Sequence, residues 1–473
     1  MNSEDLAYLP THELATRIKE RQISPVEVVT TYLERIDRFN PSLNAYITVC
    51  REDALRNAHM CEKAIVNREN VGPLHGVPIG LKDQIYTKEI RTTAGSKILS
   101  DFVPTQDATL VTKLKDAGAI ILGKQNLTEF ALGGTVKFPY GEPKNPWNLN
   151  HSPAGSSSGS GIASAAALCS ASIGEDTGGS VRGPASANSI VGLRPSWGRV
   201  SRNGIVPVCW SLDTAGPLTR TVQDTALILN VISGHDPKDE WSSHLPVPDY
   251  SSPLTGDIKG IRIGVIKELL SNSFLNAEVQ EAVTQAASML EGLGAEIEEI
   301  SLPLVEIAGP IFMAICDSEG AAYHRDWLEQ TPDTYDQATR RRLFAASLLP
   351  LSLYYKAQQI RTLIRQQILV AFEHCQVLLC PTSGTPPPTI QAAKNIISSP
   401  TEAVESLFKG RMYSTPFVLS ATPALSMPCG FTQTGLPIGL QLISAPFDEV
   451  SILRVAHAYE QTTSWHTLRP GLI

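Results

Sequence analysis

Two turns rich in glycine and serine, joined by a short apolar segment, constrain what this chain can fold into more than any other feature. The first reads Ala-Gly-Ser-Ser-Ser-Gly-Ser-Gly over residues 154–161, and the second reads Gly-Glu-Asp-Thr-Gly-Gly-Ser-Val-Arg over residues 174–182. A single Gly/Ser cluster is typical of a flexible loop. Here the residues between the turns, beginning Ile-Ala-Ser-Ala-Ala-Ala-Leu at residue 162, are small and apolar enough to be buried. Turns anchored to core elements hold their hydroxyl groups in place, which favours a chemical role for the serines.

The composition is that of an ordinary soluble globular protein. Of its 473 residues, 42% are hydrophobic and 18% are charged. The net charge of −8 argues against a nucleic-acid-binding surface. The first residues are acidic where a signal peptide would be basic, and no uninterrupted apolar stretch approaches the ~20 residues of a membrane span. We therefore expect a cytoplasmic protein that binds neither nucleic acid nor a membrane.

The eight cysteines and ten histidines do not form a metal-binding pattern. The chain contains neither a Cys-x-x-Cys nor a His-Glu-x-x-His motif. Cysteines scattered among apolar residues are typical of buried thiols in a reducing compartment. We therefore expect no disulfide framework and no metal.

Short apolar segments that alternate with helical segments predict an α/β fold. Strands are expected at residues 77–81, 119–122, 261–266, 295–300, 377–380, 425–427 and 438–443, and helices at 107–117 and 279–290. Two further amphipathic helices are expected between residues 11 and 38, with Ser24 capping the second and Pro25 in its first turn. Alternation of this kind implies a sheet with helices on both faces.

Lys82 and two serines are the candidate catalytic groups. Lys82 ends the apolar run 77–81, Ser156 lies in the first turn, and Ser180 lies in the second. Burial disfavours the charged form of an amine, so a buried Lys82 could accept a serine proton. A structural alternative is an ion pair of Lys82 with Asp83. The pairing of the lysine with two serine-bearing turns favours catalysis.

The first turn has two other interpretations. Residues 155–159 match the Gly-x-Ser-x-Gly elbow of α/β-hydrolases, for which His457 is the candidate histidine. The second interpretation is a phosphate-binding loop, because a glycine-rich turn before a helix can bind phosphate. The turn lacks the Lys-Ser/Thr pair of a P-loop, which argues against this interpretation. We favour lysine as the base.

The two glycines before Ser180 can bring backbone N–H groups close to one point. Such an arrangement of Gly178 and Gly179 favours an oxyanion hole. The structural alternative is an ordinary glycine turn in which Ser180 caps a helix. Asp176 and Arg182 flank this turn, and we expect them to brace it rather than to contact substrate.

These motifs together resemble the amidase signature family. The matching segments are Ala154 to Ser160, Gly174 to Ala185 and Val191 to Pro195. The similarity extends through residues 74–83, 123–130, 198–201, 216–220, 428–430 and 437–441, and so covers nearly the whole chain. Ala154 and Ser158 stand where the family has glycines.

The resemblance implies a Ser-cisSer-Lys triad. Its members are Ser180 as nucleophile, Ser156 as a shuttling serine that follows a cis peptide bond, and Lys82 as base. The implied oxyanion hole consists of the backbone N–H groups of Thr177, Gly178, Gly179 and Ser180, with structural support from Ser157, Asp176 and Arg182. The implied fold is a single α/β/α domain over residues 1–473 around a large mixed sheet, with an N-terminal helical region (1–65), a signature core (66–210) and a remainder (211–473). No cofactor is implied.

The implied reaction is hydrolysis of a small-molecule amide, or of an anilide or carbamate, through a Ser180 acyl-enzyme. The alternative is the A-type component of glutamyl-tRNA amidotransferase, which works with partner chains. Those proteins bind the amino group of glutamine with an acidic residue where this chain has Arg411, although Arg361 resembles their carboxylate-binding arginine. Because arginine repels an ammonium group, we favour a free-standing amidase, with a homodimer as one option for its assembly. We expect its substrate pocket to include Phe130, Gly133, Trp210, Arg361 and Arg411.

Overall fold

A sheet of eleven strands forms the centre of the computed structural model, which describes residues 2–394 and 399–471. In spatial order its strands are β1, β3, β2, β4, β6, β5, β10, β11, β9, β7 and β8. Their bounds are β1 (Tyr46–Val49), β2 (Pro78–Lys82), β3 (Ile120–Gln125), β4 (Ala171–Glu175), β5 (Val191–Arg194), β6 (Ala215–Thr219), β7 (Arg262–Ile266), β8 (Glu296–Ile300), β9 (Val377–Pro381), β10 (Ala424–Phe431) and β11 (Pro437–Ser444).

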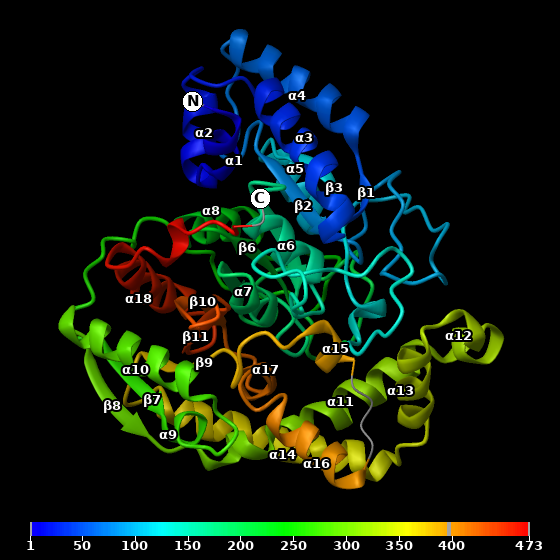
Figure 1. Ribbon diagram of the computed structural model, residues 1–473, viewed down its shortest axis with the longest axis vertical. Helices are drawn as coiled ribbons and strands as arrows, with labels where there is room; N and C mark the ends of the chain where they lie inside the picture. Colours follow the sequence, from blue (N-terminus) through cyan, green and yellow to red (C-terminus); the bar gives the residue numbers. More distant parts are fainter. Residues whose placement is uncertain (1, 395–398, 472–473) are drawn as a thin grey trace.

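The sheet is mixed. Strand β2 pairs in parallel with β3 and β4, and β7 pairs in parallel with β8 and β9. The neighbours between β4 and β9 are antiparallel, as is β1 against β3. In Figure 1 the sheet runs from β1 at the upper right to β8 at the lower left. The expected large mixed sheet is confirmed.

Helices cover both faces because alternate side chains of a strand point to opposite sides. In β9, Val377 and Leu379 enter one hydrophobic core while Leu378 and Cys380 enter another. The helices of the first core are α5 (Thr109–Asp116), α8 (Val222–Ile232), α10 (Ala277–Gly292) and α18 (Glu449–Gln461). The other face is covered by α6 (Ser158–Ala165), α7 (Arg182–Ala187), α11 (Ala308–Tyr323), α14 (Leu351–Ala371) and α17 (Thr415–Leu419).

A helical region at the β1 end of the sheet contains the N-terminal residues (Figure 1). Its helices are α1 (Ser3–Tyr8), α2 (Thr11–Lys19), α3 (Pro25–Leu43) and α4 (Arg51–Val66). The expected break at Ser24 is confirmed, since its hydroxyl accepts hydrogen bonds from the N–H groups of Val26 and Glu27 and Pro25 begins α3. The eight cysteines are free thiols, and all but Cys61 are buried.

The remaining helices are short or lie beyond the sheet, and α12 and α13 project at the right of Figure 1. Their bounds are α9 (Lys267–Leu270), α12 (Arg325–Gln330), α13 (Gln337–Ser347), α15 (Ile390–Ala393) and α16 (Pro400–Lys409), with 3-10 turns η1 (Glu129–Ala131), η2 (Pro303–Ile307), η3 (Pro332–Thr334) and η4 (Trp465–Thr467). Among the described residues no helix is long and apolar enough to span a bilayer. Nor do three or more His, Cys, Asp or Glu side chains in those ranges gather as metal ligands.

Candidate active site

Lys82 and Ser156 meet although 74 positions separate them in the chain. Lys82 is the last residue of β2, and Ser156 lies in the turn that leads into α6. The Lys82 Nζ donates a hydrogen bond of 2.8 Å to the Ser156 Oγ. Both side chains are buried, and the peptide bond between Gly155 and Ser156 is cis.

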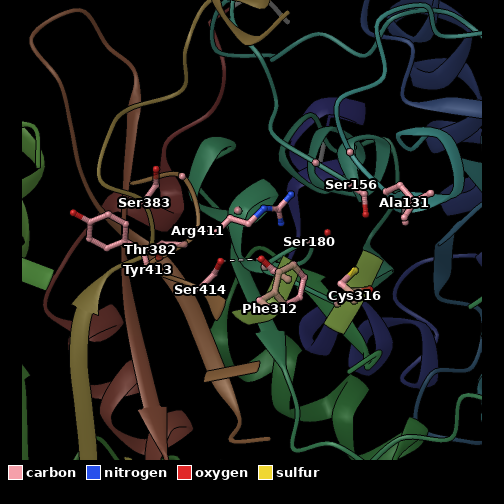
Figure 2. Close-up of a pocket in the computed structure, with 18 of the residues that line it drawn as sticks. Ala131, Ser156, Ser180, Phe312, Cys316, Thr382, Ser383, Arg411, Tyr413 and Ser414 are labelled. Carbon is pink, nitrogen blue, oxygen red and sulfur yellow. Dashed lines mark hydrogen bonds between the residues drawn. The ribbon is translucent and has the colours of Figure 1, made fainter. Parts of the chain in front are cut away.

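Ser180 lies in the second turn, between β4 and α7, and faces the same cavity as Ser156. Its backbone carbonyl accepts a hydrogen bond of 3.3 Å from the Ser157 N–H, which ties the two turns together. The Ser157 hydroxyl in turn donates to the Glu175 carbonyl at 3.1 Å. The cavity has a volume of about 670 Å³, and Figure 2 shows Ser180 between Ser156 and Arg411 among the residues that line it.

Backbone N–H groups surround Ser180, but one of them already has a hydrogen-bond acceptor within the protein. Among the described residues, the N–H groups of Thr177, Gly178 and Ser180 have no hydrogen-bond acceptor. The Gly179 N–H donates to Asp176 Oδ1 at 2.8 Å. Gly179 adopts a φ of +112°, which favours glycine at that position. Of the expected oxyanion donors, the structure thus leaves three open and gives Gly179 another partner.

The Asp176 carboxylate stabilises the turn that carries Ser180. Its carboxylate accepts hydrogen bonds from the N–H groups of Gly179 and Val181, and it pairs with Arg182 at 3.0 Å. Arg194 lies 3.6 Å from the same carboxylate. Burial opposes ionisation, yet the Arg182 and Arg194 guanidiniums hold the pKa of Asp176 well below its usual range. Asp176 and Arg182 do not open onto the cavity.

The electrostatic setting of Lys82 suits a base. Burial lowers the pKa of Lys82, while the nearby Glu175 carboxylate opposes that effect. The net direction is downward, which favours a neutral amine more than at an exposed lysine.

Two arginines form part of the cavity wall beyond the serines. The Arg411 guanidinium lies 5.3 Å from the centre of the Phe312 ring and makes no hydrogen bond or ion pair with another described residue. Arg342 lines the same cavity and pairs with Asp317 at 2.6 Å. Burial and the proximity of Arg342 both lower the pKa of Arg411. The cavity therefore contains two cations and one neighbouring carboxylate.

Of the five expected pocket residues, Gly133 and Arg411 line the cavity, whereas Phe130, Trp210 and Arg361 do not. Phe130 packs against Trp327 with a ring separation of 5.4 Å. Trp210 is largely exposed and its ring stacks on Arg202. Arg361 donates to the backbone carbonyls of Leu419 and Ser211. Each of these three side chains contacts a residue of another segment instead of lining the cavity.

Several wall residues were not singled out from the sequence, although three of them lie within the segment 310–355, from which pocket residues were expected. They come from α11, α13, the loop after β9 and the segment before α17, and they are Phe312, Cys316, Arg342, Thr382 to Thr385, Tyr413 and Ser414. The composition of residues 381–389 predicts an ordinary surface loop. Their position directly after a buried strand could have indicated that they line a cavity at the end of the sheet. His457 lies on α18 and is not among the residues that line the cavity.

The comparisons with known proteins agree on one family. A family model described as Amidase matches residues 27–453. The glutamyl-tRNA(Gln) amidotransferase of Geobacter metallireducens has an A-type component that is 43% identical to this chain, over 99% of this chain and 100% of that protein.

Solved structures with the same fold have more varied descriptions. A chain from a vestigial protein complex that reveals the origins of an s-triazine catabolic enzyme is 31% identical, with a TM-score of 0.89, over 96% of this chain and 98% of that one. The peptide amidase of Stenotrophomonas maltophilia is 31% identical with a TM-score of 0.82, over 96% of each chain.

Proposed function

This chain belongs to the amidase family of hydrolases, which act on carbon–nitrogen bonds, and from that premise we propose that it hydrolyses a carboxamide through an acyl-enzyme on Ser180. The observation that carries the proposal is the buried hydrogen bond of 2.8 Å between Lys82 and Ser156, at the wall of the cavity onto which Ser180 opens. A base, a relay hydroxyl and a nucleophile in that arrangement are the parts that acyl transfer needs.

The reaction proceeds in two halves. Ser180 Oγ attacks the carbonyl carbon while its proton passes to Ser156 and the proton of Ser156 passes to neutral Lys82. The open N–H groups of Thr177, Gly178 and Ser180 stabilise the oxyanion. The carbon–nitrogen bond then breaks as Ser156 returns a proton to the leaving nitrogen. Water attacks the resulting ester, and the carboxylic acid leaves a restored Ser180.

The similarity to known proteins supports the role of an amidotransferase component over that of a free-standing amidase, against the preference drawn from the sequence. Relatives at 43% and 41% identity, each matched over nearly the whole chain, are A-type components of glutamyl-tRNA(Gln) amidotransferases. In that role the carboxamide is that of glutamine, and the ammonia passes to a partner chain.

The Arg411 side chain supports a second candidate, a free-standing amidase for carboxamides that carry a carboxylate. A cation on the cavity wall repels the α-ammonium group of glutamine and attracts an anion. Arg342 adds a second positive charge to the same wall, and Asp317 compensates for one of the two. A substrate that carries a negative charge and no ammonium group suits this wall best.

Two matched amides distinguish these candidates. Glutaramate is glutamine without its α-amino group. The ratio of their kcat/KM values therefore reports whether the cavity favours or disfavours a substrate with an α-ammonium group. Ammonia release is measured for both and for acetamide, and aniline release for an anilide, each beside Ser180→Ala. Preference for glutamine supports the amidotransferase role, and preference for glutaramate supports the free-standing amidase. Turnover that survives Ser180→Ala would contradict the proposed mechanism.

A further inference from the structure

Lys82 has a charged neighbour besides Ser156. Its Nζ lies 3.1 Å from Glu175 Oε2, and both side chains are essentially inaccessible to solvent. The contact follows from the topology, because Lys82 and Glu175 are the last residues of β2 and β4. These strands are parallel neighbours, so their carboxyl ends leave the sheet at one edge.

Glu175 is held by a chain of polar groups that leads to a second buried carboxyl. The Thr177 Oγ lies 2.5 Å from Glu175 Oε1 and 2.7 Å from Asp213 Oδ1. A hydroxyl has one proton and can donate to only one of these oxygens, so the other contact needs a protonated carboxyl. Burial and the nearby Glu175 raise the pKa of Asp213 to about 8. Asp213 therefore donates to Thr177 and Thr177 donates to Glu175 Oε1, while Glu175 Oε2 faces Lys82.

The other charges around Lys82 are compensated by partners of their own. Asp176 pairs with Arg182 and lies 3.6 Å from Arg194. Arg202, which lies beside Glu175 in a small cavity, pairs with Asp239 at 3.0 Å. Glu175 is thus the carboxylate left to balance a charge on Lys82.

We propose that Glu175 is a positioning residue that orients Lys82 and stabilises its ammonium form. In a Ser-His-Asp triad the buried aspartate orients the histidine and stabilises its imidazolium form in the same way. The relay then has four members, Ser180, Ser156, Lys82 and Glu175. This inference rests on the proposed function, since it assigns a partner to the base of that mechanism.

Proton balance explains why the base needs a carboxylate. As Ser180 attacks, an O–H bond of Ser156 breaks and a new N–H bond forms on Lys82, which becomes a buried ammonium. A buried ammonium without a counter-charge is costly, and Glu175 supplies that charge at 3.1 Å. When the leaving nitrogen departs, Lys82 returns the proton to Ser156. Glu175 neither gains nor loses a proton in these steps.

The test uses an alkyl phosphonofluoridate, which phosphonylates an activated serine with loss of fluoride and needs no knowledge of the substrate. The labelling rate of Ser180 is followed by mass spectrometry from pH 5 to pH 10 in wild type and in Glu175→Gln. The rate rises with pH as Lys82 loses its proton. Without the carboxylate the pKa of Lys82 falls, so in Glu175→Gln we expect this rise to move by about 1 pH unit or more toward acid. The plateau rate falls by about tenfold or more because the base is weaker.

Three further variants separate a charge effect from a packing defect. Glu175→Asp retains the charge and should label with a pH profile nearer to that of wild type. Glu175→Ser is neutral and should move the profile as Gln does, which keeps the comparison available if one variant fails to fold. Glu449→Gln makes the same change at a buried glutamate that accepts from the Ser196 N–H, and should leave the profile in place.

The outcomes distinguish two failures. Neutral variants that label more slowly at an unmoved pH profile would show that Glu175 only supports packing, and would overturn this inference alone. A wild-type protein that is not labelled at Ser180 at any pH would overturn the proposed function beneath it. A shift toward acid in both neutral variants, with little shift in Glu449→Gln, is the expected result.

Discussion

A methyl group added at Gly178 tests the oxyanion turn directly. Its Cβ would lie 2.5 Å from Phe312 Cζ, 3.0 Å from Phe312 Cε1 and 3.2 Å from Arg411 Nη1. Carbon atoms in contact normally lie about 3.5–4.0 Å apart, so the ring or the turn must move by about 1 Å. Phe312 is buried in the core formed by α11, α14 and α17, so much of the movement falls on the turn.

The consequence of Gly178→Ala is larger for catalysis than for stability. Loss of one aligned oxyanion donor costs about 2.7–4 kcal/mol, or about 10²- to 10³-fold in rate. Overpacking of this kind costs about 1–3 kcal/mol of folding free energy. We therefore expect a folded protein with a lower melting temperature and a labelling rate of Ser180 reduced by at least about a hundredfold.

The assay measures the labelling rate and the thermal unfolding of Gly178→Ala beside two references. Gly292→Ala adds a methyl group where no atom lies within 4 Å and should label like wild type. Phe312→Leu, combined with Gly178→Ala, removes the ring atoms that the methyl group meets and should recover part of the rate. A Gly178→Ala protein that labels within about threefold of wild type would refute the reasoning, which predicts at least about a hundredfold loss, and so would a double variant without recovery.

Three further predictions follow from single contacts. Arg411→Asp replaces the repelling cation by an attracting anion and should raise the kcat/KM ratio of glutamine to glutaramate by at least about tenfold; an unchanged ratio would show that Arg411 does not face the bound amide. Burial raises the pKa of Glu460 from 4.5 to about 8, so folding favours its protonated form and wild type loses stability as pH rises through that window. Glu460→Gln, which can still accept the Val222 N–H, should gain more in melting temperature at pH 8 than at pH 5, and an equal gain at both would contradict the assignment. Ser24→Ala removes the acceptor of the Val26 and Glu27 N–H groups and should lower the free energy of unfolding by about 1 kcal/mol in urea titrations, with Ser273→Ala, at an exposed serine, as the reference.

The central strands show where pattern reasoning succeeds and where it fails. The expected strands at 77–81 and 377–380 appear as β2 and β9, because each is a continuous apolar run. Strand β6 was missed because Ala-Gly-Pro-Leu-Thr has no such run. The glycine is required there, since a Cβ on Gly216 would lie 1.9 Å from the Leu193 carbonyl oxygen of the neighbouring strand. A close approach of two backbones is not visible in either strand alone.

In the candidate site too, residues within local motifs could be predicted, whereas residues brought together only by tertiary packing could not. Lys82, Ser156 and Ser180 were found because each follows a distinctive local motif. Arg342 lies on α13, far along the chain, and only the packing of α11 and α13 brings it to the cavity. Glu175 occupies a variable position of its motif, and its contact with Lys82 depends on two strand ends becoming neighbours. The single-domain organisation and the catalytic roles stay predictions.

The central claim is that Ser180 is a nucleophile activated by Lys82. The most direct test digests the phosphonofluoridate-treated protein and identifies the modified peptide, in wild type and in Lys82→Met. The account predicts one adduct, on Ser180, that forms at least about a hundredfold more slowly without Lys82. An adduct on another residue, or labelling of Lys82→Met at the wild-type rate, would contradict it.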